Sequence, residues 1–219
     1  MADPNEADSR KQMLQVMTTE HFVLQTARSA TIQEANQRAN LFLTTVSSTT
    51  IAIAFVAQVT QMGGLFVLFS LILLPCVYFI GVVTFVRATQ VAVEDMVHAR
   101  GMARIRHYYV EIAPEVGRYL IHPVHDDRSA LSVDKGFRSS EWQFFATASG
   151  MVSTISSVIA GVFTAIVGKS VIGLGIELSV MVGLVSFAAS ILWLRHYHVQ
   201  AWAEAEQKLS VLFPGPAHR

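Results

Sequence analysis

The chain has 219 residues, of which 52% are hydrophobic and 15% charged, and its formal net charge is zero. A typical soluble domain carries about 25% charged residues, and a nucleic-acid-binding domain usually carries a clustered positive charge. The composition therefore disfavours an ordinary soluble domain and excludes nucleic acid as the expected partner.

Charged residues avoid two long blocks of the chain. The 48 residues from 39 to 86 contain none, and the 53 residues from 142 to 194 contain only Lys169 and Glu177. The helices of a soluble bundle need a polar stripe, which these blocks lack. We therefore predict that both blocks lie in a lipid bilayer, so the bilayer is a predicted partner of the chain.

The N-terminal segment, residues 1–40, is polar, so we expect no signal peptide. Because it contains no Gly or Pro after Pro4, we expect a helix that continues into the first membrane helix. Thr31 and Glu34 have the spacing of a capping box, which could mark a break in this helix.

The first charge-free block is long enough for two crossings, since a core of about 30 Å needs about 20 helical residues. We predict a transmembrane hairpin over 41–86, with helices at about 41–60 and 65–86. Gln61–Gly64 forms the turn, and its two glycines permit the reversal. Pro75 is expected to kink the second helix.

Residues 87–141 are predicted to form a helical loop. The second membrane helix is expected to reach about Arg100, where Gly101 permits an end. An amphipathic stretch follows over 102–120, interrupted by Pro114 and Gly117.

A second transmembrane hairpin is predicted over 142–194. Its helices are placed at about 144–167 and 171–194, with a break at Gly168–Ser170. Residues 195–219 form the C-terminal helix and tail, with the helix continuing to about Phe213. The two hairpins resemble each other loosely, which is weak evidence for a parallel internal duplication.

Basic residues indicate the orientation. Of the 16 Lys and Arg residues, only Lys169 lies in a short turn between membrane helices. By the positive-inside rule, the N-terminus, the 87–141 loop and the C-terminus are cytoplasmic, and the chain is a multi-pass protein of the cell membrane. The predicted membrane-boundary anchors are Arg38, Arg87, Arg138, Arg195, Trp142 and Trp193. The fold class is all-α: a polytopic membrane protein with four transmembrane helices in two hairpins and cytoplasmic amphipathic helical extensions.

Small residues recur every fourth position in the third membrane helix. They are Ser149, Ser153, Ser157, Gly161 and Ala165. Such stripes let helix backbones approach closely, so helix packing within the chain is one interpretation. The alternative is that the serines line a polar path in a homo-oligomer.

Glu177 is the one ionisable residue placed within the hydrocarbon, where a charge costs about 2.5–3.5 kcal/mol on insertion scales. It is a candidate ion or proton site. It also lies close enough to the outer end of its helix to be an interfacial residue, with Lys169 as a partner.

No motif for catalysis or cofactor binding is present, so catalytic, cofactor and metal residues are all predicted to be none. His122, His125, Asp126 and Asp127 offer metal-ligand chemistry, but their spacing matches no standard zinc site. Cys76 is the only cysteine, so an intrachain disulfide is impossible.

Two hairpins, each followed by a helix outside the membrane, resemble the SLATT-type membrane effectors of prokaryotic defence systems. That resemblance implies a non-enzymatic membrane protein, and pore formation is proposed for the family. The doubled hairpin departs from the usual SLATT unit. Segments 21–28 and 35–39 are also similar to uncharacterised, mostly actinobacterial, four-helix membrane proteins. Neither resemblance carries functional residues to this chain.

Three functions remain open on the sequence. The first is an oligomeric pore or membrane-perturbing effector controlled by its cytoplasmic helices. The second is a membrane anchor or scaffold for a cytoplasmic protein, and a small-molecule ligand is compatible with either. The third is a small ion-coupled transporter that uses Glu177.

Overall fold

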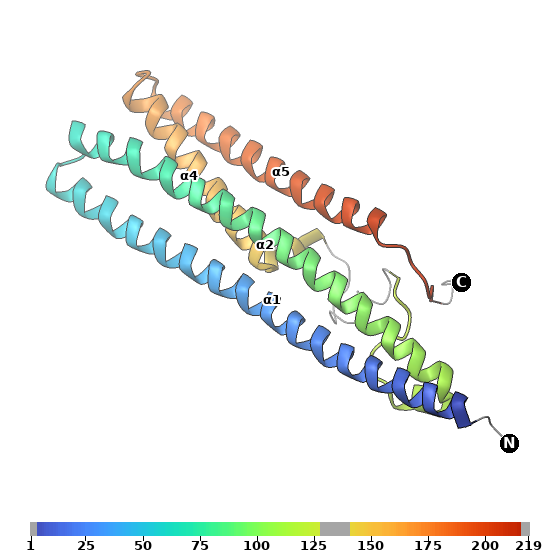
Figure 1. The fold of residues 1–219 in the computed structure, drawn as a ribbon. Helices are drawn as coiled ribbons and strands as arrows, with labels where there is room; N and C mark the ends of the chain where they lie inside the picture. The colour runs from blue at the N-terminus through green and yellow to red at the C-terminus, as the bar shows by residue number, and fades with distance from the viewer. Residues whose placement is uncertain (1–3, 128–140, 216–219) are drawn as a thin grey trace. The chain divides into compact units, whose positions relative to one another are not determined.

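The structure is a computed structural model that describes residues 4–127 and 141–215. Its elements in chain order are α1 (Pro4–Val59), α2 (Gly64–Ile112), the 3-10 helices η1 (Pro114–Tyr119) and η2 (Glu141–Ala146), α4 (Ala148–Ser170) and α5 (Ile176–Lys208) (Figure 1). No strand occurs among these described residues. The predicted all-α class is confirmed.

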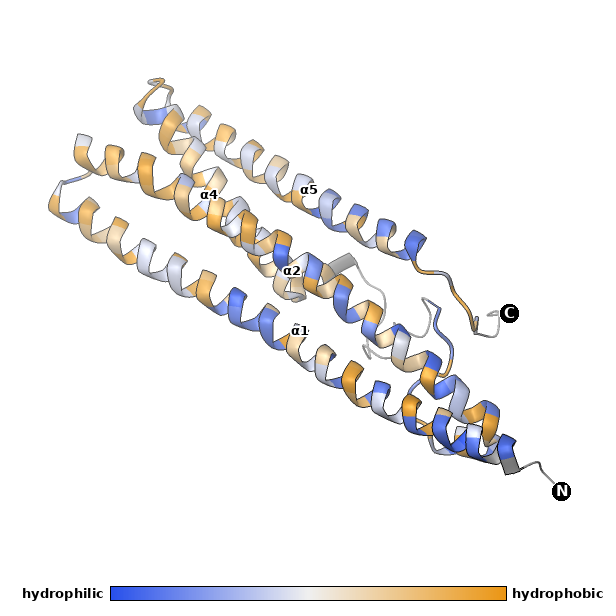
Figure 2. Cartoon of the chain, in the orientation of Figure 1, coloured by the Kyte–Doolittle hydropathy of each residue, from blue (hydrophilic) through white to orange (hydrophobic). Residues whose placement is uncertain are grey.

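Within the described part of the chain, four helices, α1, α2, α4 and α5, are long and apolar enough to cross a membrane. Hydrophobic residues predominate in the last part of α1, the first part of α2, α4 and the first part of α5 (Figure 2). The 23 residues of α4 suit a single crossing of about 20 residues. The prediction of four membrane-length helices is therefore confirmed.

The chain forms two compact units. One, which we call the membrane unit, comprises residues 34–91 and 141–204. The other, the extension unit, comprises the described residues 4–33, 92–127 and 205–215. The divisions between the two units after residues 33 and 91 fall inside α1 and α2, and both helices are continuous at these positions.

The membrane unit has a core to which α1, α2, α4 and α5 all contribute. Its fully or nearly fully buried side chains include Phe42, Phe85, Val152 and Leu194. Large apolar side chains elsewhere on these helices are exposed, as lipid contact requires. The mixture of a buried apolar core and an exposed apolar surface is characteristic of a membrane bundle.

The turn between α1 and α2 differs from the sequence prediction. Positive φ angles occur at Gln61 (48°) and Met62 (58°), whereas Gly63 and Gly64 do not have them. The Met62 N–H donates to the Ala57 carbonyl oxygen at 3.0 Å, which closes the end of α1. The reversal therefore depends on a left-handed helix cap, and α2 begins directly at Gly64.

The turn between α4 and α5 also lies later than predicted. Helix α4 continues through Gly168–Ser170, and the reversal occupies residues 171–175. Gly173 takes the left-handed conformation there, with φ of 78°. Because α5 begins at Ile176, it is five residues shorter at its start than the predicted helix.

Other predicted helix ends are wrong. Helix α1 has no break at Thr31, whose hydroxyl donates to the Arg28 carbonyl oxygen instead of capping a helix. Helix α2 passes through Gly101 to Ile112, and Gly101 permits close packing, since a Cβ there would lie 2.8 Å from Leu24 Cδ1 of α1. Helix α5 ends at Lys208 and not near Phe213.

The extension unit is stabilised by ion pairs. Arg28 of α1 pairs with Asp95 of α2 at 2.9 Å, and Arg100 of α2 pairs with Glu206 at 3.6 Å. Met96 and Ile105 are among its buried apolar side chains. This unit therefore has packed contacts of its own.

Candidate functional site

The small-residue stripe of α4 is buried within the membrane unit. Ser149, Ser153 and Ser157 are at most 2% exposed, and Gly161 is buried as well. Ala165, the last member, is half-buried and faces Gly183 of α5. The stripe lies between helices of one chain.

Two glycines define the closest contact between α4 and α5. A Cβ atom on Gly161 would lie 2.8 Å from the Gly183 carbonyl oxygen, and a Cβ on Gly183 would lie 2.8 Å from the Gly161 carbonyl oxygen. Only residues without a side chain permit this approach. Gly81 of α2 is constrained by side chains, because a Cβ there would collide with Ser156 of α4 and Phe42 of α1.

Three hydroxyl groups connect α2, α5 and α4 in the interior of the membrane unit. The Tyr78 hydroxyl lies 3.3 Å from the Ser190 hydroxyl, and the Ser157 hydroxyl donates to Ser190 at 3.1 Å. The single Ser157 proton also lies within reach of the Ser153 carbonyl oxygen, 2.8 Å from Oγ, so this donation is shared between two acceptors. We call Tyr78, Ser190 and Ser157 the hydroxyl chain. Buried hydroxyls need such partners because their transfer from water is costly.

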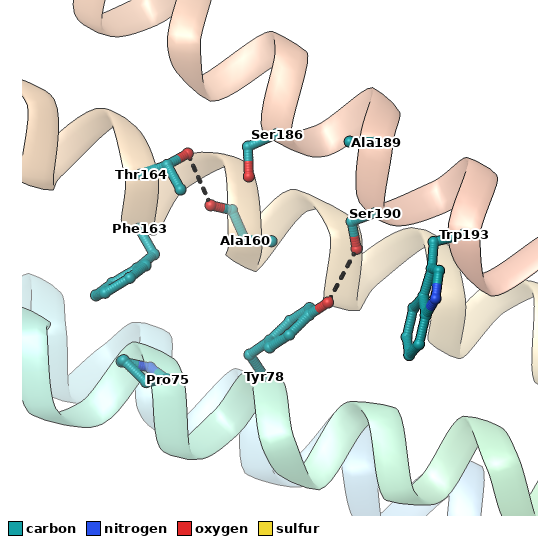
Figure 3. A pocket seen from close by; sticks show the side chains of 9 residues that line it. All are labelled: Pro75, Tyr78, Ala160, Phe163, Thr164, Ser186, Ala189, Ser190 and Trp193. Atoms are coloured by element: carbon teal, nitrogen blue, oxygen red, sulfur yellow. Dashed lines mark hydrogen bonds between the residues drawn. The ribbon is translucent and has the colours of Figure 1, made fainter.

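A cavity of about 370 Å³ lies beside the hydroxyl chain. Figure 3 shows Tyr78, Phe163 and Trp193 projecting into the space between α2, α4 and α5, with the Ser186 hydroxyl turned towards it. Thr164 also lines the cavity, and its hydroxyl proton is donated to carbonyl oxygens of its own helix. The lining is mainly apolar: Pro75, Tyr78, Ala160, Phe163, Thr164, Ser186, Ala189, Ser190 and Trp193.

Sequence reasoning identified the stripe but missed its partners. Tyr78 and Ser190 lie 112 residues apart, and neither belongs to a motif. A tyrosine in an apolar segment is the only signal that could have suggested a buried hydroxyl partner.

Three threonines in the apolar part of α1 are satisfied within their own helix. The hydroxyls of Thr44, Thr45 and Thr50 donate to carbonyl oxygens four residues earlier, at 2.8–2.9 Å. Such bonds satisfy a hydroxyl in a membrane helix from within that helix, so no partner from another helix is needed.

Two of the predicted boundary arginines share one carboxylate. Arg87 of α2 donates twice to Glu34 of α1, at 2.8 and 3.0 Å, and Arg38 donates to the same group at 2.9 Å. The two-bond geometry makes the Arg87 contact the stronger one. This cluster ties α1 to α2 next to the charge-free block.

The remaining anchors are placed differently. Arg195 is half-buried, and Trp193 is 54% exposed while also lining the cavity. Arg138 and the side chain of Trp142 lie outside the described residues.

Glu177 is exposed and occupies the first turn of α5. The sequence placed it six residues into its helix, whereas the later start of α5 makes it the second residue. A carboxylate in a first helical turn is favoured by the helix dipole. Its position thus has a local electrostatic reason.

Two acidic residues considered as metal ligands bind the C-terminal segment of the extension unit. The Asp126 carboxylate is fully buried and lies 2.7 Å from Arg104 Nε. It also accepts the backbone N–H groups of Leu212 and Phe213, at 3.2 and 2.9 Å. Asp127 accepts the Gly215 N–H at 2.9 Å. We call the contacts of Asp126 with Arg104, Leu212 and Phe213 the Asp126 clasp.

The histidines nearby do not join these carboxylates in a metal site. His125 Nε2 is 3.9 Å from Asp127, and His122 lines a separate cavity. Within residues 4–127 and 141–215, no group of three His, Cys, Asp or Glu side chains is arranged to hold a metal ion.

Comparison of the chain with protein-family models, with curated proteins and with solved structures finds no match.

Proposed function

We propose that this chain is a non-enzymatic integral membrane protein that forms an oligomeric pore, or otherwise perturbs the membrane, under the control of its extension unit. In this proposal it crosses the cell membrane four times as two hairpins. Its termini and the 87–141 segment are cytoplasmic, as the distribution of basic residues favours.

The hydroxyl chain is the observation that carries the proposal. Tyr78, Ser190 and Ser157 come from three different helices and bond to one another among apolar side chains. Hydroxyls that bond across helices can exchange these partners for water when the helices separate. A conducting state therefore needs α5 to move away from α2 and α4, which wets the hydroxyl chain.

The experiment measures ion flux from liposomes that contain the purified full chain. Ser157→Leu fills the contact with an apolar side chain and is expected to change flux at least several-fold. Thr50→Val is the matched control, because the Thr50 hydroxyl is exposed and bonds within α1 only. Equal effects of the two substitutions would contradict the proposal.

A second measurement follows the wetting of the hydroxyl chain directly. In a Cys76→Ser background, Ser190→Cys should react with a charged, water-soluble thiol reagent under conducting conditions and resist it otherwise. Liposomes that stay silent in every condition, with Ser190→Cys always unreactive, would count against a pore.

An anchor or scaffold for a cytoplasmic protein is the second candidate. It is favoured by apolar side chains that α1 exposes in the extension unit, where Val16, Phe22 and Val23 are 55–63% exposed. Exposed apolar patches outside a membrane often mark protein contacts. Crosslinking in cells with mass spectrometry would support this candidate if one dominant partner were recovered, and self-contacts alone would favour the pore.

A further inference from the structure

A second cavity, of about 540 Å³, lies entirely within the extension unit. Helix α1 contributes His21 and Arg28 to its lining, and α2 contributes Arg106 and Tyr109. His122 comes from the segment after η1. Among the described residues, the lining contains two arginines and two histidines but no Asp or Glu.

Arg106 gives the cavity a built-in cation. Its side chain is only 7% exposed, and its Nε donates to the Pro123 carbonyl oxygen at 3.0 Å. That bond fixes the guanidinium in place. An arginine held in this way can bind an oxyanion with less loss of side-chain entropy than a free surface arginine.

Arg28 is the second cation and is oriented by Asp95, which its Nε contacts at 2.9 Å. An anion in the cavity would share Arg28 with Asp95. Because this pair reduces the net positive charge, the anion must contribute a strong acceptor, and phosphate and carboxylate both do so.

His21 lines the same cavity and has a ring nitrogen without a hydrogen-bond partner among the described residues. This atom, Nδ1, is shielded from solvent. A buried polar atom without a partner costs free energy.

The rest of the lining is mixed, with the polar residues Gln25 and Ser29 beside an apolar part. Ile32, Met102 and Leu120 form the apolar part, and the Tyr109 ring lies 6.5 Å from the His21 ring, centroid to centroid. A cavity with a cationic part and an apolar part suits a ligand with the same two parts.

We propose that this cavity binds a phosphate monoester, with the phosphate at Arg106, Arg28 and His21 and the organic group against Tyr109 and its apolar neighbours. A phosphate monoester carries a charge of about −1.5 to −2 at pH 7 and three acceptor oxygens. It therefore offers an acceptor to each of the three groups. The ligand is either a free phosphate ester or the headgroup of an anionic lipid such as phosphatidic acid.

Calorimetric titration of the full chain in phosphatidylcholine nanodiscs tests this site. Phenyl phosphate is the probe, and benzoate and phenol are its comparisons. We expect phenyl phosphate to bind at least tenfold more tightly than either. Arg106→Gln should weaken its binding about tenfold or more, as loss of a charged hydrogen bond does.

Arg118→Gln is the matched control, because Arg118 is an exposed arginine of the same unit that does not line the cavity. Equal weakening by both substitutions would show a general charge effect and overturn the proposal. Tighter binding of benzoate than of phenyl phosphate would also overturn it.

Two further measurements keep the result decisive if Arg106→Gln does not fold. Addition of phenyl phosphate to the unmodified chain should shift the ¹⁵N resonance of the His21 imidazole, assigned with His21→Asn. An unchanged resonance at saturating probe would contradict the site. The same titration in nanodiscs that contain phosphatidic acid distinguishes the two sources. If phosphatidic acid by itself occupies the cavity and displaces phenyl phosphate, the ligand is a lipid headgroup. Binding is measured without ion flux, so it can fail or succeed independently of the proposed pore.

Discussion

Gly161 of α4 and Gly183 of α5 lie with their backbones in direct contact, since a Cβ on either would be 2.8 Å from the carbonyl oxygen of the other. Both neighbours are backbone atoms, which have little freedom to move aside. Close backbone approach is a main source of stability in membrane helices, where the hydrophobic effect between helices is absent. This contact therefore determines how α4 and α5 pair.

Gly161→Ala and Gly183→Ala should each destabilise the membrane unit, by about 1–3 kcal/mol as overpacked substitutions do. The measurement is reversible unfolding in mixed detergent micelles. Gly175→Ala is the control, because nothing lies within 4 Å of a Cβ at that position. A control as destabilising as Gly183→Ala would show that the effect does not come from the helix contact.

The bond between Ser157 and Ser190 should contribute modestly to stability. A double-mutant cycle with Ser157→Ala and Ser190→Ala is expected to give a coupling energy of about 0.6 kcal/mol, the average for hydrogen bonds between membrane helices. Tyr78→Phe removes the third hydroxyl, which lies at the longer distance of 3.3 Å. Its coupling to Ser190 should be smaller than that of Ser157, and the reverse order would disagree with the geometry.

The bond between Glu34 and Arg87 should contribute more to stability than the bond between Glu34 and Arg38. Arg87 joins two helices through two hydrogen bonds, whereas Arg38 makes one within α1 and is exposed. Arg87→Gln is therefore expected to lower the unfolding midpoint further than Arg38→Gln. Exposed pairs four residues apart in a helix contribute only about 0.3–0.5 kcal/mol. Equal midpoints for the two variants would contradict this ranking.

The Asp126 clasp should loosen in acid. Burial raises the pKa of Asp126, but the N–H groups of Phe213 and Leu212 and the Arg104 guanidinium outweigh it, so the pKa lies below the ordinary 3.8. A carboxyl with a lowered folded-state pKa stabilises the fold fully above its unfolded pKa, and this stability is lost as pH falls through the folded-state pKa. Hydrogen exchange at the Leu212 and Phe213 amides, corrected for intrinsic rates, should therefore accelerate only below about pH 3.8.

Asp126→Asn tests the same clasp at neutral pH. It removes the charge that Arg104 contacts but keeps the size of the side chain, so residues 209–215 should become more sensitive to proteolysis. Asp127→Asn is the matched control, since Asp127 is less buried than Asp126 and accepts the Gly215 N–H. Similar protease sensitivity in both variants would contradict a special role of Asp126.

Much of the fold could be predicted because the hydrocarbon core of a bilayer favours apolar residues in each membrane segment, whichever segments pack beside it. Residues 39–86 contain no charge, and any segment of this kind is more stable as a helix in lipid than exposed to water. The same reasoning identified the stripe of α4, since small residues every fourth position share one helix face. It could not identify Ser190 as the partner of Ser157, because their proximity depends on how α4 and α5 pair.

The turns show a second limit. The sequence drew attention to Gly63 and Gly64, yet the left-handed residues are Gln61 and Met62. Glycine permits that conformation but does not require it. The residue that adopts it depends on where the hydrogen bonds of α1 end, and Met62 N–H meets the Ala57 carbonyl oxygen.

By itself, then, the sequence determined that the chain is all-helical, with four membrane-length apolar helices, because these properties follow from the solvation of each segment. Only the tertiary structure decided which polar groups meet. Asp126 and Leu212 lie 86 residues apart, and neither residue type predicts a clasp. Such contacts arise from packing of distant segments, which the local pattern of charge and hydropathy does not encode.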